Sequence, residues 1–305
     1  MTPRATAGNE SVYCIYSDSE VGGGEANLDH VIPLALGGTD EFRVVARSDL
    51  NGKMSGEIEG PLANDFLVHV ARSRGQVLGH SARVPRARAK KAKIVEPDSE
   101  RPVSLEFGDK DGLRVWDPKK KLYLTEQEMS GLTITNSVSI DLSIRIRFTA
   151  KVALGAGYYT YGERFRRTVD HAELRALMWS YSHARKETLR NLKTRVYDQF
   201  SEIAPADREV VVILKALCES AAGSCVILGV GPSNLLIAVG VLRTFIGLVN
   251  VPADSAELRR TNEGVALVVK NGNLKTISLD SAMAQLGKGI EEARRRASAK
   301  ANDAQ

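Results

Sequence analysis

Cysteine is scarce in this chain, and Cys14, Cys218 and Cys225 are the only three among 305 residues. Their spacing forms neither a disulfide framework nor a set of metal-binding pairs, which excludes a small disulfide-stapled scaffold and a four-thiolate zinc site. Unpaired thiols are typical of a reducing compartment, so we expect the protein in the cytoplasm.

The chain also lacks an apolar leader and a long apolar run. Residues 1–6 contain no apolar core, so no signal peptide is predicted. The longest apolar stretch, residues 225–251, contains Arg243 and is broken by Gly229, Gly231, Pro232, Ser233 and Asn234. This pattern predicts buried strands in place of a membrane span, and we expect no membrane partner.

Charge of either sign is present in ordinary amounts, with 42 Lys and Arg against 37 Asp and Glu, a net charge of +5. So small an excess suits a polyanionic partner but is a weak argument by itself. A chain of this length and apolar content usually forms about two domains with a sizeable core.

One segment concentrates the groups that chemistry needs: Asp29-His30-Val31-Ile32-Pro33, then Gly37-Gly38, then Asn51. A bare Asp-His pair is more often an ordinary surface pair ahead of a loop. Adjacent side chains on a strand point to opposite faces, so Asp29 and His30 converge only where the backbone bends. Pro33 and the glycine pair make such a bend possible, which favours a functional site over an ordinary surface pair.

The chemistry of this segment suits phosphodiester hydrolysis. Histidine is the side chain whose unperturbed pKa lies closest to neutrality, which suits a general base that deprotonates water. Mg²⁺ prefers few carboxylates and keeps several waters, so one Asp and one amide form a reasonable inner shell.

Three stretches, residues 28–40, 50–53 and 60–65 (the last being Gly-Pro-Leu-Ala-Asn-Asp), carry a family resemblance. Over residues 13–66 the chain resembles the HNH endonuclease family. The resemblance implies a ββα-metal unit with one divalent ion, Mg²⁺ or Mn²⁺, and DNA as the substrate. It also implies His30 as general base, Asp29 as a metal ligand and Asn51 as the second ligand.

The chain departs from that family in two ways. Many members bind a structural zinc through two Cys-x-x-Cys pairs, whose positions here hold Cys14, Ser17, Arg47 and Leu50. Structural zinc is therefore not expected, and packing of Val12, Ile15, Val44 and Val45 would have to replace it. The middle Asn of the family is also missing, and either Asp40 or Asp49 could take its place.

Around the motif we predict two strands at residues 11–16 and 28–36, followed by a mostly helical segment from residue 51 to about 75 that Gly60-Pro61 divides. Lys53 on this helix is a candidate phosphate contact. Glu57 and Asn64 are candidate neighbours of the ion, although each of these three residues is more typically solvated or structural.

Residues 83–93 hold six cations and no acid: Arg83, Arg86, Arg88, Lys90, Lys91 and Lys93. Such a run binds a phosphate backbone by releasing condensed counterions. Pro85 and the interleaved alanines also fit a flexible linker, and the two interpretations are compatible. The run contains no aromatic residue, so stacking of single-stranded bases is not indicated.

Beyond residue 100 the prediction depends on periodicity. Short strands are expected at 103–107, 113–116 and 121–124, and a long strand or hairpin at 132–148, where apolar residues fall on even positions. Residues 149–200 are expected to be helical. Residues 210–286 are expected to form an antiparallel sheet, with a hairpin turn at 270–273 and a helical or frayed tail at 291–305.

These observations predict an α+β protein: an HNH-like nuclease domain at 1–80, a basic linker at 81–100, a C-terminal α+β domain with antiparallel strands at 101–290 and a tail at 291–305. We expect a metal-dependent endonuclease on double-stranded DNA, and the resemblance suggests a role in restriction, phage defence or mobile DNA. Two alternatives stay open, a catalytically degenerate DNA-binding protein and an RNA-cleaving nuclease. Homo-oligomer formation is also open.

Overall fold

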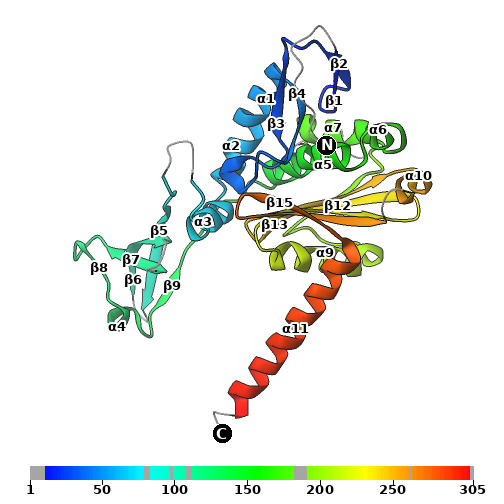
Figure 1. Cartoon of the computed structure of the whole chain (residues 1–305). Helices are drawn as coiled ribbons and strands as arrows, with labels where there is room; N and C mark the ends of the chain where they lie inside the picture. The colour runs from blue at the N-terminus through cyan, green and yellow to red at the C-terminus, as the bar shows by residue number, and fades with distance from the viewer. Residues whose placement is uncertain are drawn as a thin grey trace.

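The computed structural model describes residues 11–78, 83–96, 99–107, 112–181, 191–260 and 263–302. The fold is mixed α+β, and the strand pairs of all four described sheets are antiparallel, as the sequence predicts (Figure 1).

The N-terminal part contains two small hairpins followed by helices. β1 (Val12–Cys14) pairs with β2 (Ser19–Val21), and β3 (Ala26–His30) pairs with β4 (Arg43–Arg47). The chain then forms α1 (Ser48–Met54), the π-helical turn η2 (Ser55–Glu59), α2 (Gly60–Ala63) and α3 (Phe66–Arg74). The predicted helical segment is confirmed, but it breaks at Asp65, which caps α3, and not at Gly60-Pro61.

The prediction of two strands at 11–16 and 28–36 is confirmed in part, because β1 lies within the first range and β3 covers the start of the second, but residues 31–36 are not a strand. β3 ends at His30 and takes β4 as its partner, because the chain turns through Pro33 into the short 3₁₀ helix η1 (Leu34–Leu36). A proline has no amide hydrogen to donate to a sheet, so the strand cannot continue there.

Residues 87–135 form a five-stranded sheet with the order β8-β7-β6-β5-β9 and its own hydrophobic core. Its strands are β5 (Ala87–Glu96), β6 (Ser99–Phe107), β7 (Leu113–Asp117), β8 (Leu122–Tyr123) and β9 (Thr133–Thr135), with the short helix α4 (Glu126–Met129) between the last two. The three short strands predicted in this part of the chain are confirmed. Figure 1 shows this sheet to one side of the rest of the molecule.

The expected linker is wrong for residues 87–96, which are strand β5. Ala89, Ala92 and Ile94 on this strand are buried in the sheet core, while the cations between them are exposed. The interleaved alanines, which suggested a flexible linker, are the buried face of a strand whose register shifts between Ala89 and Ala92.

The expected strand at 132–148 is confirmed only for β9, at Thr133–Thr135; residues 136–141 are not in a strand, and residues 142–148 are helical. Asp141 accepts hydrogen bonds from the amides of Ser143 and Ile144, which caps the helix α5 (Leu142–Tyr161). Two short helices follow, α6 (Glu163–Thr168) and α7 (His171–Ser180). The helical prediction for 149–200 fails at its end, where β10 (Arg195–Asp198) is a strand, and residues 182–190 lie outside the described chain.

The C-terminal part is a six-stranded sheet with the order β10-β13-β12-β11-β14-β15. Its remaining strands are β11 (Ser224–Val230), β12 (Asn234–Val241), β13 (Thr244–Pro252), β14 (Gly264–Lys270) and β15 (Asn273–Ser278). The antiparallel sheet predicted at 210–286 is confirmed between residues 224 and 278, but residues 210–220 and 279–286 are helical. The predicted hairpin turn is also confirmed, and in it Asn271 and Gly272 have φ of 52° and 77°.

Helices cover both faces of this sheet. α5 packs on one face, and α9 (Arg208–Ser220), preceded by the turn η4 (Pro205–Asp207), packs on the other. The short helix α10 (Ser255–Arg259) lies beyond β13. The last helix, α11 (Leu279–Asn302), begins against the α9 face and then projects from the body, so the predicted tail is helical through residue 302 (Figure 1).

The largest hydrophobic core joins the N-terminal hairpins and helices to α5, α7 and one face of the six-stranded sheet. The boundary predicted near residue 80 therefore does not separate two cores, and the five-stranded sheet is the part with a core of its own. No helix in the described residues is long and apolar enough to cross a membrane.

Candidate active site

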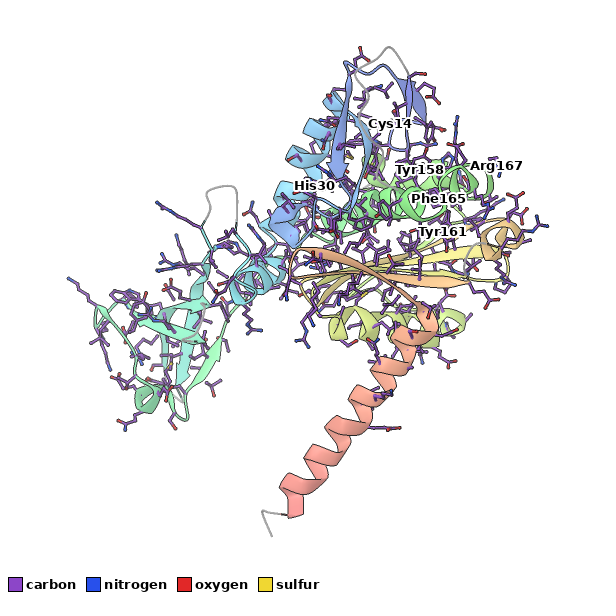
Figure 2. All side chains as sticks on the ribbon, in the orientation of Figure 1. Cys14, His30, Tyr158, Tyr161, Phe165 and Arg167 are labelled. Atoms are coloured by element: carbon purple, nitrogen blue, oxygen red, sulfur yellow. The ribbon has the colours of Figure 1, made fainter. Side chains whose placement is uncertain are left out.

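Asp29, His30 and Asn51 line one pocket of about 450 Å³, which brings together the three residues that the sequence singles out. Asp29 and His30 end strand β3, and Asn51 lies on α1, the helix that follows the β3–β4 hairpin, so the pocket lies between the end of one strand and this helix. Figure 2 shows His30 on this N-terminal part of the chain. The other residues that line the pocket are Pro33, Leu34, Ala35, Ser55, Glu59 and Leu78.

The bend predicted after His30 depends on the glycine pair. Gly37 ends η1 with φ of 78°, a conformation that favours glycine. A Cβ added to Gly38 would lie 1.7 Å from the carbonyl oxygen of Ile32, so only glycine fits there. The loop folds back tightly, and both Asp29 and His30 face the same pocket.

His30 is held by a carboxylate. Its Nε2 lies 3.0 Å from Oδ1 of Asp40, which is also 3.3 Å from Nη1 of Arg43. The hydrogen bond from His30 and the charge of Arg43, acting against slight desolvation, keep the pKa of Asp40 below its ordinary value. An ionised carboxylate only accepts hydrogen bonds, so Nε2 carries the proton and Nδ1 is the ring nitrogen left for chemistry.

Of the two acids considered as substitutes for the middle Asn of the family, Asp40 contacts His30. Asp49 instead accepts hydrogen bonds from Nε and Nη2 of Arg47, at 2.6 and 2.9 Å. The hydrogen bond from Arg47 is the main cause that lowers the pKa of Asp49.

Asp29 is buried, with 3% of its surface exposed, and two side chains bind its Oδ2. The hydroxyl of Tyr16 donates to it at 2.8 Å, and the ammonium of Lys151 lies 2.7 Å from it. Lys151 also forms an ion pair with Glu59 at 2.9 Å and donates to the carbonyl oxygens of His30 and Val31. One fully buried ammonium therefore holds both acids and the backbone of the bend.

Burial and the nearby negative charges shift the pKa of Lys151 in opposite directions. Burial lowers it, but the negative charges of Asp29 and Glu59 together outweigh burial and leave the pKa above its ordinary value. Burial, with the charge of Asp29 added, also raises the pKa of the Tyr16 hydroxyl well above its ordinary value. At neutral pH Lys151 is therefore an ammonium and Tyr16 a neutral phenol that donates to Asp29.

Lys151 reaches this position because α5 packs close to the bend. A Cβ added to Gly155, one turn further along α5, would lie 2.7 Å from the hydroxyl of Tyr16 and 3.0 Å from a methyl group of Val31. The glycine therefore allows the close approach. Sequence reasoning assigned no role to Lys151 or Glu59.

Two residues of the pocket offer oxygen atoms that a hard divalent ion could use. The side-chain nitrogen of Asn51 donates to Oδ1 of Asn27 at 3.0 Å, so its carbonyl oxygen is not used in that bond. The second candidate donor is the carboxylate of Asp29, whose Oδ2 already binds Tyr16 and Lys151, so water and substrate phosphate would have to complete the shell of a Mg²⁺ ion. No cluster of three or more His, Cys, Asp or Glu side chains suitable for a metal occurs within the described residues.

Three other predicted residues do not line this pocket. Lys53 lies over the ring of Trp179 at 4.7 Å, Glu57 pairs with Arg147 at 3.2 Å, and the side chain of Asn64 donates to Gly60. Glu59, two residues after Glu57, is the acid that reaches the pocket.

The six cations of residues 83–93 are on or next to β5, on the five-stranded sheet and not on the pocket wall. Arg86 and Arg88 lie near Glu106, and Lys93 pairs with Glu100. Among the residues that the structure describes, Arg83, Lys90 and Lys91 have no ion-pair partner, so these three are the cations best placed to bind phosphate.

The four positions of the missing zinc site are used differently. Cys14 is buried in the main core with Ile15 and Val44, which supports the expectation that packing holds the hairpins together. Val12, by contrast, is 41% exposed. Ser17 bonds to Ser19, Arg47 pairs with Asp49, and Leu50 packs against the core.

Comparisons with protein-family models, curated proteins and solved structures give no match to this chain.

Proposed function

We propose that this protein is a metal-dependent endonuclease of the HNH type that hydrolyses phosphodiester bonds in double-stranded DNA. The observation that carries the proposal is that Asp29 and His30, at the end of β3, and Asn51, on the helix after the β3–β4 hairpin, line one pocket. The contact between His30 and Asp40 adds support, because it supplies an orienting partner where the family's middle Asn is missing.

In the proposed reaction, Nδ1 of His30 takes a proton from water. The hydroxide oxygen attacks phosphorus, the bond from phosphorus to the leaving sugar oxygen breaks, and that oxygen takes up a proton from solvent. Asp40 keeps the imidazole in one orientation and stabilises its protonated form. A divalent ion held by Asp29 and Asn51 would neutralise the charge that grows on the phosphate oxygens.

One observation favours the second candidate, a DNA-binding protein without nuclease activity. Lys151 already neutralises Asp29 and Glu59, so the cluster satisfies its charges without a metal ion. In that case the cations on β5 would still bind DNA, and substitution of His30 would change no activity.

Cleavage assays on three substrates separate these candidates. Purified protein is incubated with duplex DNA, single-stranded DNA or RNA in Mg²⁺, Mn²⁺ or EDTA. Cleavage of duplex DNA that requires the metal supports the proposal, and cleavage of RNA alone would move the substrate to RNA. No cleavage of any substrate with either ion, together with a gel shift of duplex DNA, would replace the proposal by the DNA-binding candidate.

A further inference from the structure

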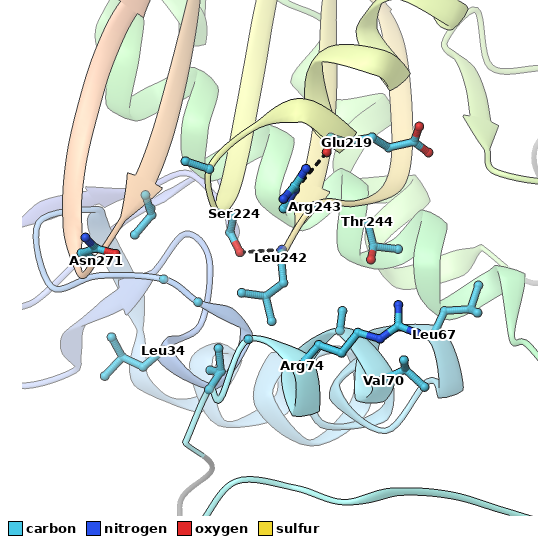
Figure 3. Close-up of a pocket in the computed structure, with 18 of the residues that line it drawn as sticks. Leu34, Leu67, Val70, Arg74, Glu219, Ser224, Leu242, Arg243, Thr244 and Asn271 are labelled. Atoms are coloured by element: carbon cyan, nitrogen blue, oxygen red, sulfur yellow. Dashed lines mark hydrogen bonds between the residues drawn. The ribbon is translucent and has the colours of Figure 1, made fainter. Parts of the chain in front are cut away.

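A second and larger pocket adjoins the candidate active site. Its volume is about 1150 Å³, above the roughly 300–1,000 Å³ of common small-molecule pockets. Leu34 and Leu78 line both pockets, so a chain that lies in one can continue into the other. Figure 3 shows how α3 forms one wall and the turn between β12 and β13 forms the opposite wall.

Each of these walls carries an arginine. Arg74 comes from α3, and Arg243 comes from the β12–β13 turn (Figure 3). Arg74 is exposed and has no ion-pair partner within the described part of the chain. Arg243 donates to the backbone oxygen of Glu219, while the carboxylate of Glu219, the one acid among the described lining residues, is 3.9 Å from Lys215. The lining therefore carries net positive charge.

The turn that presents Arg243 has an unusual backbone. Leu242 and Arg243 have φ of 49° and 66°, in a hairpin turn where Asn and Gly are the favoured residues. Non-glycine residues persist in this conformation only where the surroundings enforce it, and such positions are common at binding sites.

The surroundings that enforce it connect the turn to the candidate active site. The hydroxyl of Ser224 accepts from the amide of Leu242 and donates to the carbonyl oxygen of Leu36. A Cβ on Gly37 would lie 2.6 Å from a methyl group of Leu242. The loop that bends the chain after His30 therefore also fixes the turn that carries Arg243.

We infer that this pocket binds a phosphate-bearing nucleotide unit. Arginine is the side chain best suited to phosphate, and the two guanidinium groups stand on opposite walls. Leu34, Val70 and Leu242 offer an apolar surface to the sugar and base. The lining residues that the structure describes include no aromatic side chain, so the base is held by apolar contact and not by stacking. The source of the nucleotide is the strand being cut, a step that rests on the proposed function, or a free nucleotide.

Binding without cleavage tests this inference. A fluorescein-labelled single-stranded oligonucleotide is titrated with the full-length protein in EDTA, and anisotropy gives Kd at several salt concentrations. We expect Arg74→Ala and Arg243→Ala each to raise Kd about tenfold. Each should also reduce the slope of log K against log salt by about 0.7. Ala222→Trp, which fills the pocket from an exposed position without removing charge, should weaken binding as well.

One control makes the result specific. Arg208→Ala removes an exposed arginine on α9 that does not line the pocket, so this variant should bind like the wild type. Equal Kd values for all four variants, or no binding by the wild type, would overturn the inference. Thermal unfolding curves that match the wild type establish that each variant is folded.

Competition identifies the source of the nucleotide. If dAMP displaces the oligonucleotide, the pocket takes a free nucleotide; if only unlabelled oligonucleotide displaces it, the pocket holds a strand. Because these measurements need neither metal nor cleavage, they can succeed where the nuclease proposal fails, and they can fail where it succeeds.

Discussion

The hydrogen bond between His30 and Asp40 is the contact that prepares the imidazole for the proposed reaction. We expect Asp40→Ala to lower the cleavage rate by about 10- to 100-fold, because the ring loses the partner that fixes its orientation. Asp49→Ala is the matched control, since Asp49 pairs with Arg47 and not with His30. Initial rates on duplex DNA at saturating Mg²⁺ measure both, and equal losses in the two variants would contradict the assigned role.

Lys151 is the residue on which the stability of the site depends most. Lys151→Met leaves the buried Asp29 and the partly exposed Glu59 without their cation, so it should lower the free energy of unfolding by about 3–5 kcal/mol. Lys93→Met, at an exposed ion pair with Glu100, should cost less than about 1 kcal/mol. Urea unfolding monitored by circular dichroism gives both values. A small loss for Lys151→Met would mean that the cluster is solvated.

The pH dependence of the stability lost in Lys151→Met follows from the raised pKa of Lys151. A lysine whose pKa is higher in the folded state than its ordinary 10.5 contributes its full stabilisation below that value. The contribution disappears only as the pH rises through the higher, folded pKa. The difference in unfolding free energy between wild type and Lys151→Met should therefore be constant between about pH 6 and 9. If the difference instead decreases as the pH rises from about 6 to 9, Lys151 is not charged in the folded protein.

Sequence reasoning found Asp29, His30 and Asn51 because they lie close together in the chain and belong to chemically suitable residue types. It could not choose between Asp40 and Asp49, because both are near in sequence and only the loop geometry separates them. Lys151 follows Asp29 by more than a hundred residues, and its burial between two acids is a property of the packed structure.

Among the elements, α5 packs directly against the residues around the candidate active site. Gly155→Ala should destabilise the protein by about 1–3 kcal/mol, because the added methyl group meets Tyr16 and Val31. Gly52→Ala, on α1 with open space around it, should instead be neutral or stabilise by up to about 1 kcal/mol. Thermal unfolding of the two variants tests this contrast, and similar melting temperatures would argue against close packing of α5.

Two elements show why periodicity misled the sequence prediction. The even-numbered apolar residues of 142–148 match a strand, but in α5 odd positions are buried too, because Arg145 pairs with Asp65 in the interior. On β5 the buried face is made mostly of alanine, so its alternation with cations resembled a linker. The hairpin turn at 270–273 was predictable because Asn-Gly fixes its geometry locally.

For the whole molecule, the five-stranded sheet with its own core is the candidate duplex-binding part. Lys90→Ala/Lys91→Ala should weaken duplex binding and reduce the salt slope by about 0.9 for each lost phosphate contact. Lys119→Ala/Lys121→Ala removes the same charge from exposed positions beside the β7–β8 turn and is the control. Anisotropy titrations at several salt concentrations compare them, and identical slopes would remove β5 from the DNA path.

The most direct test of the nuclease proposal is cleavage of supercoiled plasmid by wild type and His30→Ala, in Mg²⁺ and in EDTA. His69→Ala, a histidine on α3 outside both pockets, is the matched control. We predict metal-dependent nicking or linearisation by the wild type and His69→Ala, and a rate lower by about 10²- to 10⁴-fold for His30→Ala. Equal rates for all three proteins, or cleavage that persists in EDTA, would contradict a metal-dependent nuclease with His30 as its base.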